Sequence, residues 1–308
     1  MNPRLLHASV LVLAGMTAEA QEVFTGEQYF ENAGVDLTAT EISTETVAPG
    51  LHVLFGAGGN LAVSIGAQGV LLVDDQFPAL VPKIRHAIRE LGGGTVDFVV
   101  NTHWHFDHSD GNPLFGADGS WIVAQANSRQ MMTERQLINQ IAFQIEQPAS
   151  PPEALPVITF ENGMQLHFNG EKIDILHFGP AHTTGDAAVI FRGRNVVHMG
   201  DVYNTAGYPF IDADNGGTLN GIILFCEAVL DEITNDTVVI PGHGAVGNYA
   251  DLKDYTMMLR TIRDRMTALI ADGASLDEII AAEPTAEWDE VKGDPARLLN
   301  RAYAGMMQ

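Results

Sequence analysis

A short cluster of histidines with one aspartate is the part of this sequence best suited to chemistry. Residues 103–108 read His-Trp-His-Phe-Asp-His and directly follow the apolar run 96–100. Zinc accepts imidazole nitrogen and carboxylate oxygen readily and keeps a position open for water in catalytic sites. The first two histidines can face one way while Asp107 and His108 turn toward a second point. The cluster therefore predicts a site for two metal ions side by side.

Three later segments can supply further ligands, because each places a candidate side chain just after an apolar strand. They are Pro-Ala-His-Thr-Thr-Gly-Asp around His182, His-Met-Gly-Asp ending at Asp201, and Pro-Gly-His-Gly around His243. A lone histidine at the end of a strand is more often structural than a ligand. Taken together with the cluster at 103–108, the three segments indicate one shared site.

Strands and turns must bring these ligands together. In the first half, strands are predicted over 51–55, 61–65, 70–73, 96–100 and 121–124. Apolar residues at helical spacing predict a helix over 80–91. Strand–helix–strand order favours a crossover connection, which leaves the histidine cluster at the carboxyl end of a strand, where functional loops of open α/β sheets gather.

The second half repeats the order of strands, helix, strand and histidine-bearing loop. Its strands are predicted over 157–160, 164–168, 172–178, 187–191, 195–199 and 237–240. Asn169-Gly170 between alternating strands is a strong hairpin signal. Helices are predicted over 126–146, 219–230, 252–269 and 295–307. The repeated order lies in the elements and not in residue identity.

Composition limits the partners of the chain. Its 308 residues carry 39 acidic and 16 basic side chains, for a net charge of -23. Binding of nucleic acid relies on Lys and Arg, and anionic lipid attracts basic segments, so we expect neither nucleic acid nor a membrane as a partner. The single cysteine, Cys226, excludes an intrachain disulfide and is predicted to lie in the core. A small-molecule substrate is expected, and the oligomeric state stays open.

The N-terminus has the pattern of an export signal. Arg4 is followed by a largely apolar stretch over 5–14 and by Ala-Glu-Ala at 18–20, which a signal peptidase reads. We therefore predict a signal peptide over 1–20, cleavage after Ala20 and a periplasmic location. Residues 21–46 are expected to be an N-terminal extension over the surface, and residues 47–308 one catalytic domain that ends in helices.

The four motifs together resemble the metallo-β-lactamase superfamily over roughly residues 50–250. This resemblance implies an α/β (α+β) fold of the four-layer αββα type, with two β-sheets face to face, helices outside and a metal cleft along one edge. It also implies a hydrolase with two Zn²⁺ per chain, in which a metal-bound hydroxide attacks the substrate. The element order read above agrees with this fold.

Carried over residue by residue, the resemblance implies a ligand set. The first zinc would be held by His103, His105 and His182. The second would be held by Asp107, His108 and His243, with Asp201 as a bridging or second-site ligand. Asp107 is also assigned a catalytic role. Because metal-bound imidazoles usually donate their second N–H to a neighbour, supporting contacts are expected from Asp74, Thr102, Thr183 and Asp186.

Export favours hydrolysis of β-lactams, which act in the periplasm, and the turn at 56–60 corresponds to a mobile flap of related β-lactamases. Two departures weaken this reading. Asp201 stands where one β-lactamase subclass has cysteine, and Asn204, our predicted substrate-binding residue, stands where many have a basic residue. The alternatives are a lactonase or a glyoxalase II-like thioesterase, an iron oxygenase of sulfur compounds, and a non-catalytic metal-binding accessory protein.

Overall fold

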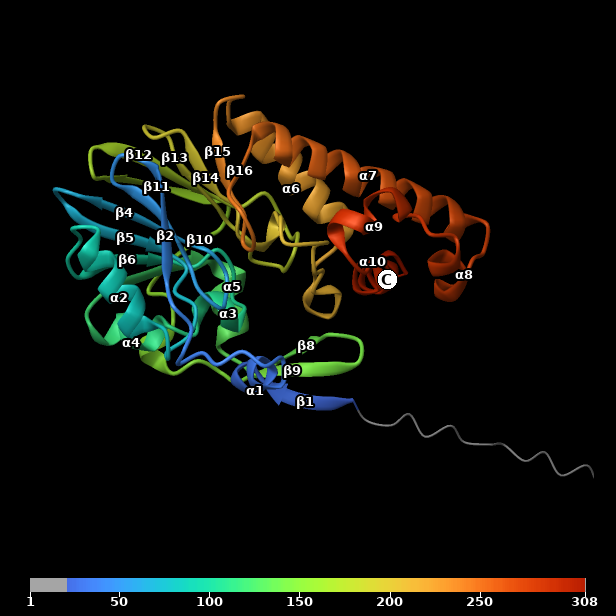
Figure 1. Cartoon of the computed structure of the whole chain (residues 1–308), viewed down its shortest axis with the longest axis horizontal. Coiled ribbons are helices and arrows are strands. Elements are labelled where there is room, and N and C mark those ends of the chain that lie inside the picture. Colours follow the sequence, from blue (N-terminus) through green and yellow to red (C-terminus); the bar gives the residue numbers. More distant parts are fainter. Residues whose placement is uncertain (1–20, 308) are drawn as a thin grey trace, which may run out of the picture.

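The computed structural model describes residues 21–307, so the predicted signal peptide and its cleavage after Ala20 lie outside the described residues. Two β-sheets pack face to face, and helices cover their outer faces (Figure 1). The predicted four-layer αββα sandwich is therefore confirmed. Strand β6 (Val96–Val100) matches its predicted bounds and ends where the histidine cluster begins.

The first sheet has seven strands within the described chain. Their spatial order is β10 (Ile158–Phe160), β7 (Trp121–Gln125), β6, β5 (Gly69–Val73), β4 (Leu61–Gly66), β3 (Leu51–Phe55) and β2 (Ser43–Ala48). Helix α2 (Val81–Glu90) makes the crossover from β5 to β6, which pair in parallel. Because strand side chains alternate, Val70 and Leu72 pack with α2 while Leu71 and Val73 face the other sheet.

The second sheet has six strands within the same range. Their order is β11 (Gly163–Phe168), β12 (Glu171–Leu176), β13 (Ala188–Phe191), β14 (Val196–His198), β15 (Val238–Ile240) and β16 (Gly247–Asn248). The predicted hairpin at Asn169-Gly170 joins β11 to β12, and both turn residues have positive φ, 53° and 79°. The outer face of this second sheet is covered by α6 (Leu219–Glu232) and α7 (Tyr249–Ala271) (Figure 1).

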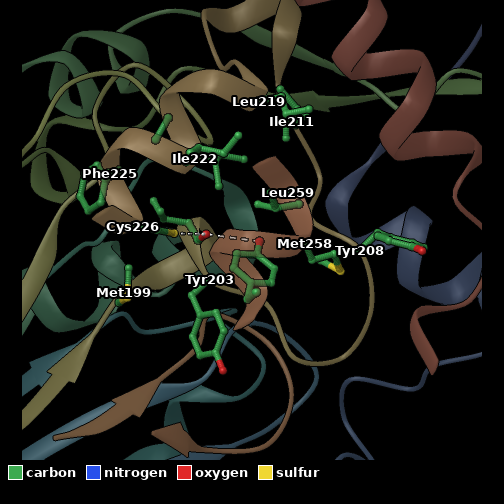
Figure 2. Packing of buried hydrophobic residues seen from close by; sticks show 14 of the residues in the cluster. Met199, Tyr203, Tyr208, Ile211, Leu219, Ile222, Phe225, Cys226, Met258 and Leu259 are labelled. Carbon is green, nitrogen blue, oxygen red and sulfur yellow. Dashed lines mark hydrogen bonds between the residues drawn. The ribbon is translucent and has the colours of Figure 1, made fainter. Parts of the chain in front are cut away.

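Cys226 lies in the core between this sheet and its helices, as predicted. Figure 2 shows it among Met199, Tyr203 and Leu259. Its Sγ lies 3.7 Å from the carbonyl oxygen of Val202. Burial raises the pKa of the thiol to about 12, so the group stays protonated at neutral pH. It is therefore unsuited to act as a nucleophile or a metal ligand.

The predicted helix over residues 126–146 is wrong beyond its first two turns. Helix α5 (Ala126–Met132) is followed by a hairpin of β8 (Gln136–Asn139) and β9 (Phe143–Gln147). Ile138 and Ile145 pair directly across this hairpin and are both buried, so their seven-residue spacing comes from strand pairing and not from a helix face. Ile141 in the turn has φ of 76°, which a right-handed helix does not contain.

Residues 21–46, expected to lie over the surface, are built into the edge of the molecule. Strand β1 (Glu22–Thr25) pairs in parallel with β9, and α1 (Gly26–Asn32) follows directly. Figure 1 shows β1, α1 and the β8–β9 hairpin together, below the two main sheets. The expected domain boundary at residue 46 falls inside β2, which pairs with β3 in the first sheet.

The C-terminal part of the chain is helical, as the sequence predicted for residues 252–269 and 295–307. After α7 come α8 (Leu276–Ala281), α9 (Ala286–Lys292) and α10 (Ala296–Met306). Two shorter helices of the first half are α3 (Phe106–Ser109) and α4 (Asn112–Ala117). Among the described residues, no helix combines the length and apolarity that crossing a bilayer requires.

Candidate metal centre

The predicted ligands lie in loops at the ends of strands from both sheets. The cluster at 103–108 follows β6 of the first sheet, and its last part forms α3. His182 lies between β12 and β13 of the second sheet, Asp201 directly follows β14, and His243 follows β15. All seven predicted ligands belong to groups whose ligand atoms lie within 4.8 Å of one another. The structure thus brings the whole predicted set to one edge.

The first group consists of His103, His105 and His182. His105 Nδ1 lies 2.9 Å from His182 Nε2, and His103 Nε2 is buried with no hydrogen-bond partner within the described chain. A tetrahedral zinc about 2.0–2.1 Å from each nitrogen would leave the nitrogens roughly 3.3 Å apart. Three buried, convergent imidazoles with this spacing fit a metal ion.

The second group consists of Asp107, His108 and His243. His243 Nε2 lies 3.2 Å from Asp107 Oδ2 and 3.3 Å from His108 Nε2. Asp201 stands between the two groups: its Oδ1 is 3.0 Å from His108 Nε2, and its Oδ2 is 3.7 Å from His182 Nε2. One carboxylate oxygen therefore faces each group, which is the geometry that a bridging ligand requires.

The two groups differ in their electrostatics. Burial lowers the pKa of His103 and of His182, which keeps these imidazoles neutral, as metal binding requires. Burial also lowers the pKa of His243, but Asp201 and Asp107 outweigh it and raise that pKa to about 10. The pKa of His108 is raised well above its usual value because the same carboxylates outweigh burial. The carboxylates thus favour positive charge at the second group, and a divalent cation would supply that charge.

Asp74 and Thr102 hold two of the imidazoles from behind. Asp74 Oδ2 accepts a hydrogen bond from His108 Nδ1 at 2.8 Å, and its Oδ1 accepts from the Thr102 backbone N–H at 2.7 Å. The Thr102 hydroxyl lies 3.0 Å from His103 Nδ1. These contacts leave the Nε2 atom of each imidazole free to face the group. The structure therefore places both residues where the sequence analysis expected them.

Thr183 and Asp186 support the His182 loop without touching a ligand imidazole. Asp186 Oδ2 accepts from the Thr183 backbone N–H at 2.8 Å and from the Ala181 N–H at 3.2 Å. Its Oδ1 accepts from the Thr183 hydroxyl at 2.9 Å. The pair therefore fixes the shape of the loop rather than the orientation of a ring.

A segment that the sequence did not reveal, residues 210–212, orients two further imidazoles, His105 and His182. His105 Nε2 donates to Asp212 Oδ2 at 2.9 Å, and His182 Nδ1 donates to the Phe210 carbonyl at 2.9 Å. Asp212 is fully buried, and Asn215 donates to both of its carboxylate oxygens. The only signal in the sequence is an acid at the end of the apolar run Tyr-Pro-Phe-Ile, in a loop that lacks histidine.

The turn at 56–60, which the sequence placed where related β-lactamases carry a mobile flap, is partly buried and joins two ligand loops. Gly59 N–H donates to the Asp107 carbonyl at 3.0 Å. Asn60 Nδ2 donates to the carbonyls of Pro241 and Gly244, both at 2.9 Å, on either side of His243. A Cβ at residue 59 would overlap the His108 ring, which explains why glycine occupies this position. These bonds tie the turn to both ligand loops, and its residue Ala57 lines the pocket over the ligands.

A pocket of about 280 Å³ opens onto the ligands. Its walls come from α1, the β8–β9 hairpin, the loop at 210 and α10; outside the ligand loops they include Tyr29, Phe30, Ile138, Gln140, Phe210 and Arg297. Asn204, the predicted substrate-binding residue, does not line it. The Asn204 side chain accepts from the Ala206 N–H at 2.8 Å, and its backbone bridges to His243.

Comparison with known proteins identifies the family. The profile of the metallo-beta-lactamase superfamily matches residues 52–259, more than half of the chain and all seven candidate ligands. The chain belongs to the metallo-β-lactamase superfamily. Members of this superfamily are metal-dependent hydrolases, so hydrolysis is the reaction class of this chain.

Solved structures of the superfamily share the fold. The DIM-1 metallo-β-lactamase is 19% identical with a TM-score of 0.57, and the match covers 72% of this chain and 98% of that one. A metallo-β-lactamase from Pontibacter korlensis is 15% identical with a TM-score of 0.58, over 71% and 99%. A double mutant of the sec-alkyl sulfatase PisA1 is 15% identical with a TM-score of 0.67, over 85% and 50%.

A curated relative is similar to part of the sequence. The alpha subunit of 2,4-dinitroanisole O-demethylase from Nocardioides sp. (strain JS1661) is 24% identical over 144 residues. The match covers 46% of this chain and 40% of that protein. The chain thus spans less than half the length of this relative, and the shared part establishes no substrate.

Proposed function

We propose that this chain is a dinuclear zinc hydrolase that cleaves the amide bond of β-lactams. The observation that carries the proposal is the pair of ligand groups, with Asp201 between them, opening onto one small pocket. Bound zinc would lower the pKa of a water ligand to about 7 and polarise the substrate carbonyl. The one cysteine of the chain does not compete as a nucleophile, because its thiol is buried and protonated.

The protein residues have separable tasks in this proposal. Asp74, Asp212 and the Phe210 carbonyl fix three imidazoles through the nitrogen that faces away from the ions. Asp107 lines the pocket, and despite burial His108 and His243 keep its pKa below the usual value. Its carboxylate can therefore accept a hydrogen bond from water at neutral pH and orient it toward the substrate.

A second candidate is hydrolysis of a sulfate ester. The likeness to the sec-alkyl sulfatase extends over 85% of the chain, against 72% for the DIM-1 β-lactamase. Lactones and thioesters remain alternatives because Asp201 occupies the place that thioesterase-like members give to an aspartate. We also propose export to the periplasm with cleavage after Ala20, which the intact mass of protein from a periplasmic extract would test.

The test is a hydrolysis panel on purified, zinc-loaded protein. It contains a cephalosporin, a carbapenem, a lactone, a glutathione thioester and a secondary alkyl sulfate. We expect turnover of at least one β-lactam above the rate of each other class. Clear cleavage of another substrate class without turnover of either β-lactam would overturn the first choice and identify its replacement.

The site assignment has its own control. The substitution His105→Ala should remove zinc from the first group and abolish turnover, because two imidazoles cannot hold the ion. His86, an exposed histidine of α2 outside the pocket, is the matched control. His86→Ala should keep two zinc ions by elemental analysis and the full rate. Wild-type zinc content in His105→Ala would show that the ligand assignment is wrong.

A further inference from the structure

A positively charged side chain that lines the metal pocket comes from outside the region that the family profile covers. Arg297 lies in the first turn of α10 and lines the pocket together with His105, Asp201 and His243. It is the only Lys or Arg among the pocket-lining residues of the described chain. The superfamily match ends at residue 259, so neither the ligand motifs nor their spacing points to this residue.

The Arg297 guanidinium is held in place but keeps most of its donors free. It lies 5.3 Å above the centre of the Phe210 ring, and Nη1 donates to Gln140 Oε1 at 3.0 Å. Arginine has five N–H donors, so one amide bond leaves the others for a ligand. Aromatic stacking and a single neutral acceptor orient a guanidinium without neutralising its charge.

The lack of a carboxylate partner is notable in so acidic a chain. Acidic side chains outnumber basic ones by 39 to 16, yet within residues 21–307 no ion pair forms at Arg297. Arg301, one turn further along α10, pairs with Asp214 at 2.9 Å. The positive charge of Arg297 is therefore available to a group that enters the pocket.

We propose that Arg297 determines substrate specificity by binding an anionic group of the substrate. The ligand class is a small monoanion, a carboxylate, sulfonate or sulfate, whose apolar body lies against Tyr29, Phe30 and Ile138. A planar guanidinium binds such oxygens through paired hydrogen bonds. This inference rests on the proposed hydrolase function. In this proposal Arg297 binds the substrate, the role that was predicted for Asn204.

The competing explanation is purely structural. Arg297 joins α10 to the tip of the β8–β9 hairpin through Gln140, so it could simply hold the wall of the pocket. That role would affect charged and neutral ligands equally. A test must therefore compare an anion with a neutral molecule of the same shape, and arginine with lysine, which keeps the charge but loses the planar fork.

Binding is measured first, independently of turnover, by calorimetry on zinc-loaded protein. The probes are naphthalene-2-sulfonate and neutral 2-methylnaphthalene, with wild type, Arg297→Gln, Arg297→Lys and Arg89→Gln. Arg89 is an exposed arginine of α2 outside the pocket, which makes Arg89→Gln a matched control. We expect Arg297→Gln to weaken sulfonate binding about tenfold or more, the usual range for a charge-assisted hydrogen bond. The sulfonate affinity of Arg297→Lys should lie between those of wild type and Arg297→Gln. The control should match wild type.

The second measurement compares turnover of a cephalosporin with that of its methyl ester. We expect wild type to prefer the acid through KM, and Arg297→Gln to lose that preference. Equal sulfonate affinity in wild type and Arg297→Gln would overturn the inference, as would an equal loss for both naphthalene probes. If no β-lactam is turned over but sulfonate binding depends on Arg297, the β-lactam proposal fails while the anion site stands.

Discussion

At the scale of single residues, the metal centre depends on what holds the far nitrogen of the ligand imidazoles, which the structure shows for three of them. His108 is held by Asp74, His105 by Asp212 and His182 by a backbone carbonyl. Each of these contacts fixes which nitrogen carries the proton and which one faces the ligand group. Such partners commonly affect metal affinity almost as strongly as the ligands themselves.

The substitution Asp212→Asn tests this at the partner that the sequence did not reveal. It keeps the shape of the side chain but removes the charge that stabilises the His105 ring. We expect zinc affinity at the first group to fall by about 10- to 100-fold. Competition with a chromophoric chelator measures it. Asp264→Asn, at an aspartate whose side chain is 68% exposed on α7, should not change the affinity. Unchanged affinity in Asp212→Asn would reduce Asp212 to a packing role.

The sequence revealed the metal ligands far better than their supports. Histidines and acids at strand ends are uncommon enough to stand out, and Asp74 could be inferred because it ends a strand beside the cluster. Asp212 and Arg297 could not, because a single acid or base in a loop or helix resembles any surface residue. Their roles come from long-range packing. Asp212 contacts His105, which is 107 residues away along the chain, and Arg297 contacts Gln140, which is 157 residues away.

At the scale of elements, the turn at 56–60 is a brace between ligand loops. It bonds to the backbone of Asp107 on one side and to both flanks of His243 on the other. The His198 imidazole in β14 also lies 2.9 Å from the Asn60 carbonyl. The turn thus holds together the two loops that supply the second ligand group, Asp107 and His108 on one side and His243 on the other.

The substitution Gly59→Ala should disable the second group selectively. The new Cβ would overlap the His108 ring, so either the ring or the turn must move. We expect the zinc content to fall from about two ions toward one per chain, measured by elemental analysis on folded protein. Gly94→Ala is the matched control, because nothing lies within 4 Å of a Cβ there. Two tightly bound ions in Gly59→Ala would contradict this role.

The elements that the sequence misassigned have a common cause. Spacing of seven residues between Ile138 and Ile145 fits a helix and also a hairpin whose partners lie opposite each other. The positive φ at Ile141 is incompatible with a continuous helix and allows the hairpin. It could not be predicted from the sequence, because β-branched residues rarely adopt a positive φ. By contrast, β6 and the turn at Asn169-Gly170 were predictable because apolar runs and Asn-Gly leave few alternatives.

At the scale of the whole molecule, the candidate metal ligands connect the two sheets. His103 and His105 follow β6 of the first sheet, whereas His182 precedes β13 of the second. An ion in the first group would therefore join the two layers in addition to the apolar contacts between the sheets and the hydrogen bonds of the turn at 56–60. Binding of this kind adds to the free energy of unfolding by mass action.

Metal removal should accordingly lower the Tm of the protein. A ligand at about 100 times its Kd stabilises the folded state by about 2.7 kcal/mol. We expect the Tm to rise steadily with free zinc above that Kd in buffered titrations, and to fall to a constant value in excess chelator. His105→Ala should show a weaker dependence than wild type. A Tm independent of zinc would exclude the sheet-linking role.

The parallel pairing of β1 with β9 has a consequence for the order of folding. The two strands belong to opposite ends of a long stretch of chain: the Gln21 side chain bonds to the backbone of Ile141, 120 residues away. Closing so large a loop is slow and is not rewarded until the partner hairpin exists. The wall that α1 adds to the pocket depends on this late pairing. His108 and His243 are 135 residues apart, so the second ligand group also depends on a long-range contact. The metal centre and the wall that would retain a substrate are therefore both completed late in folding.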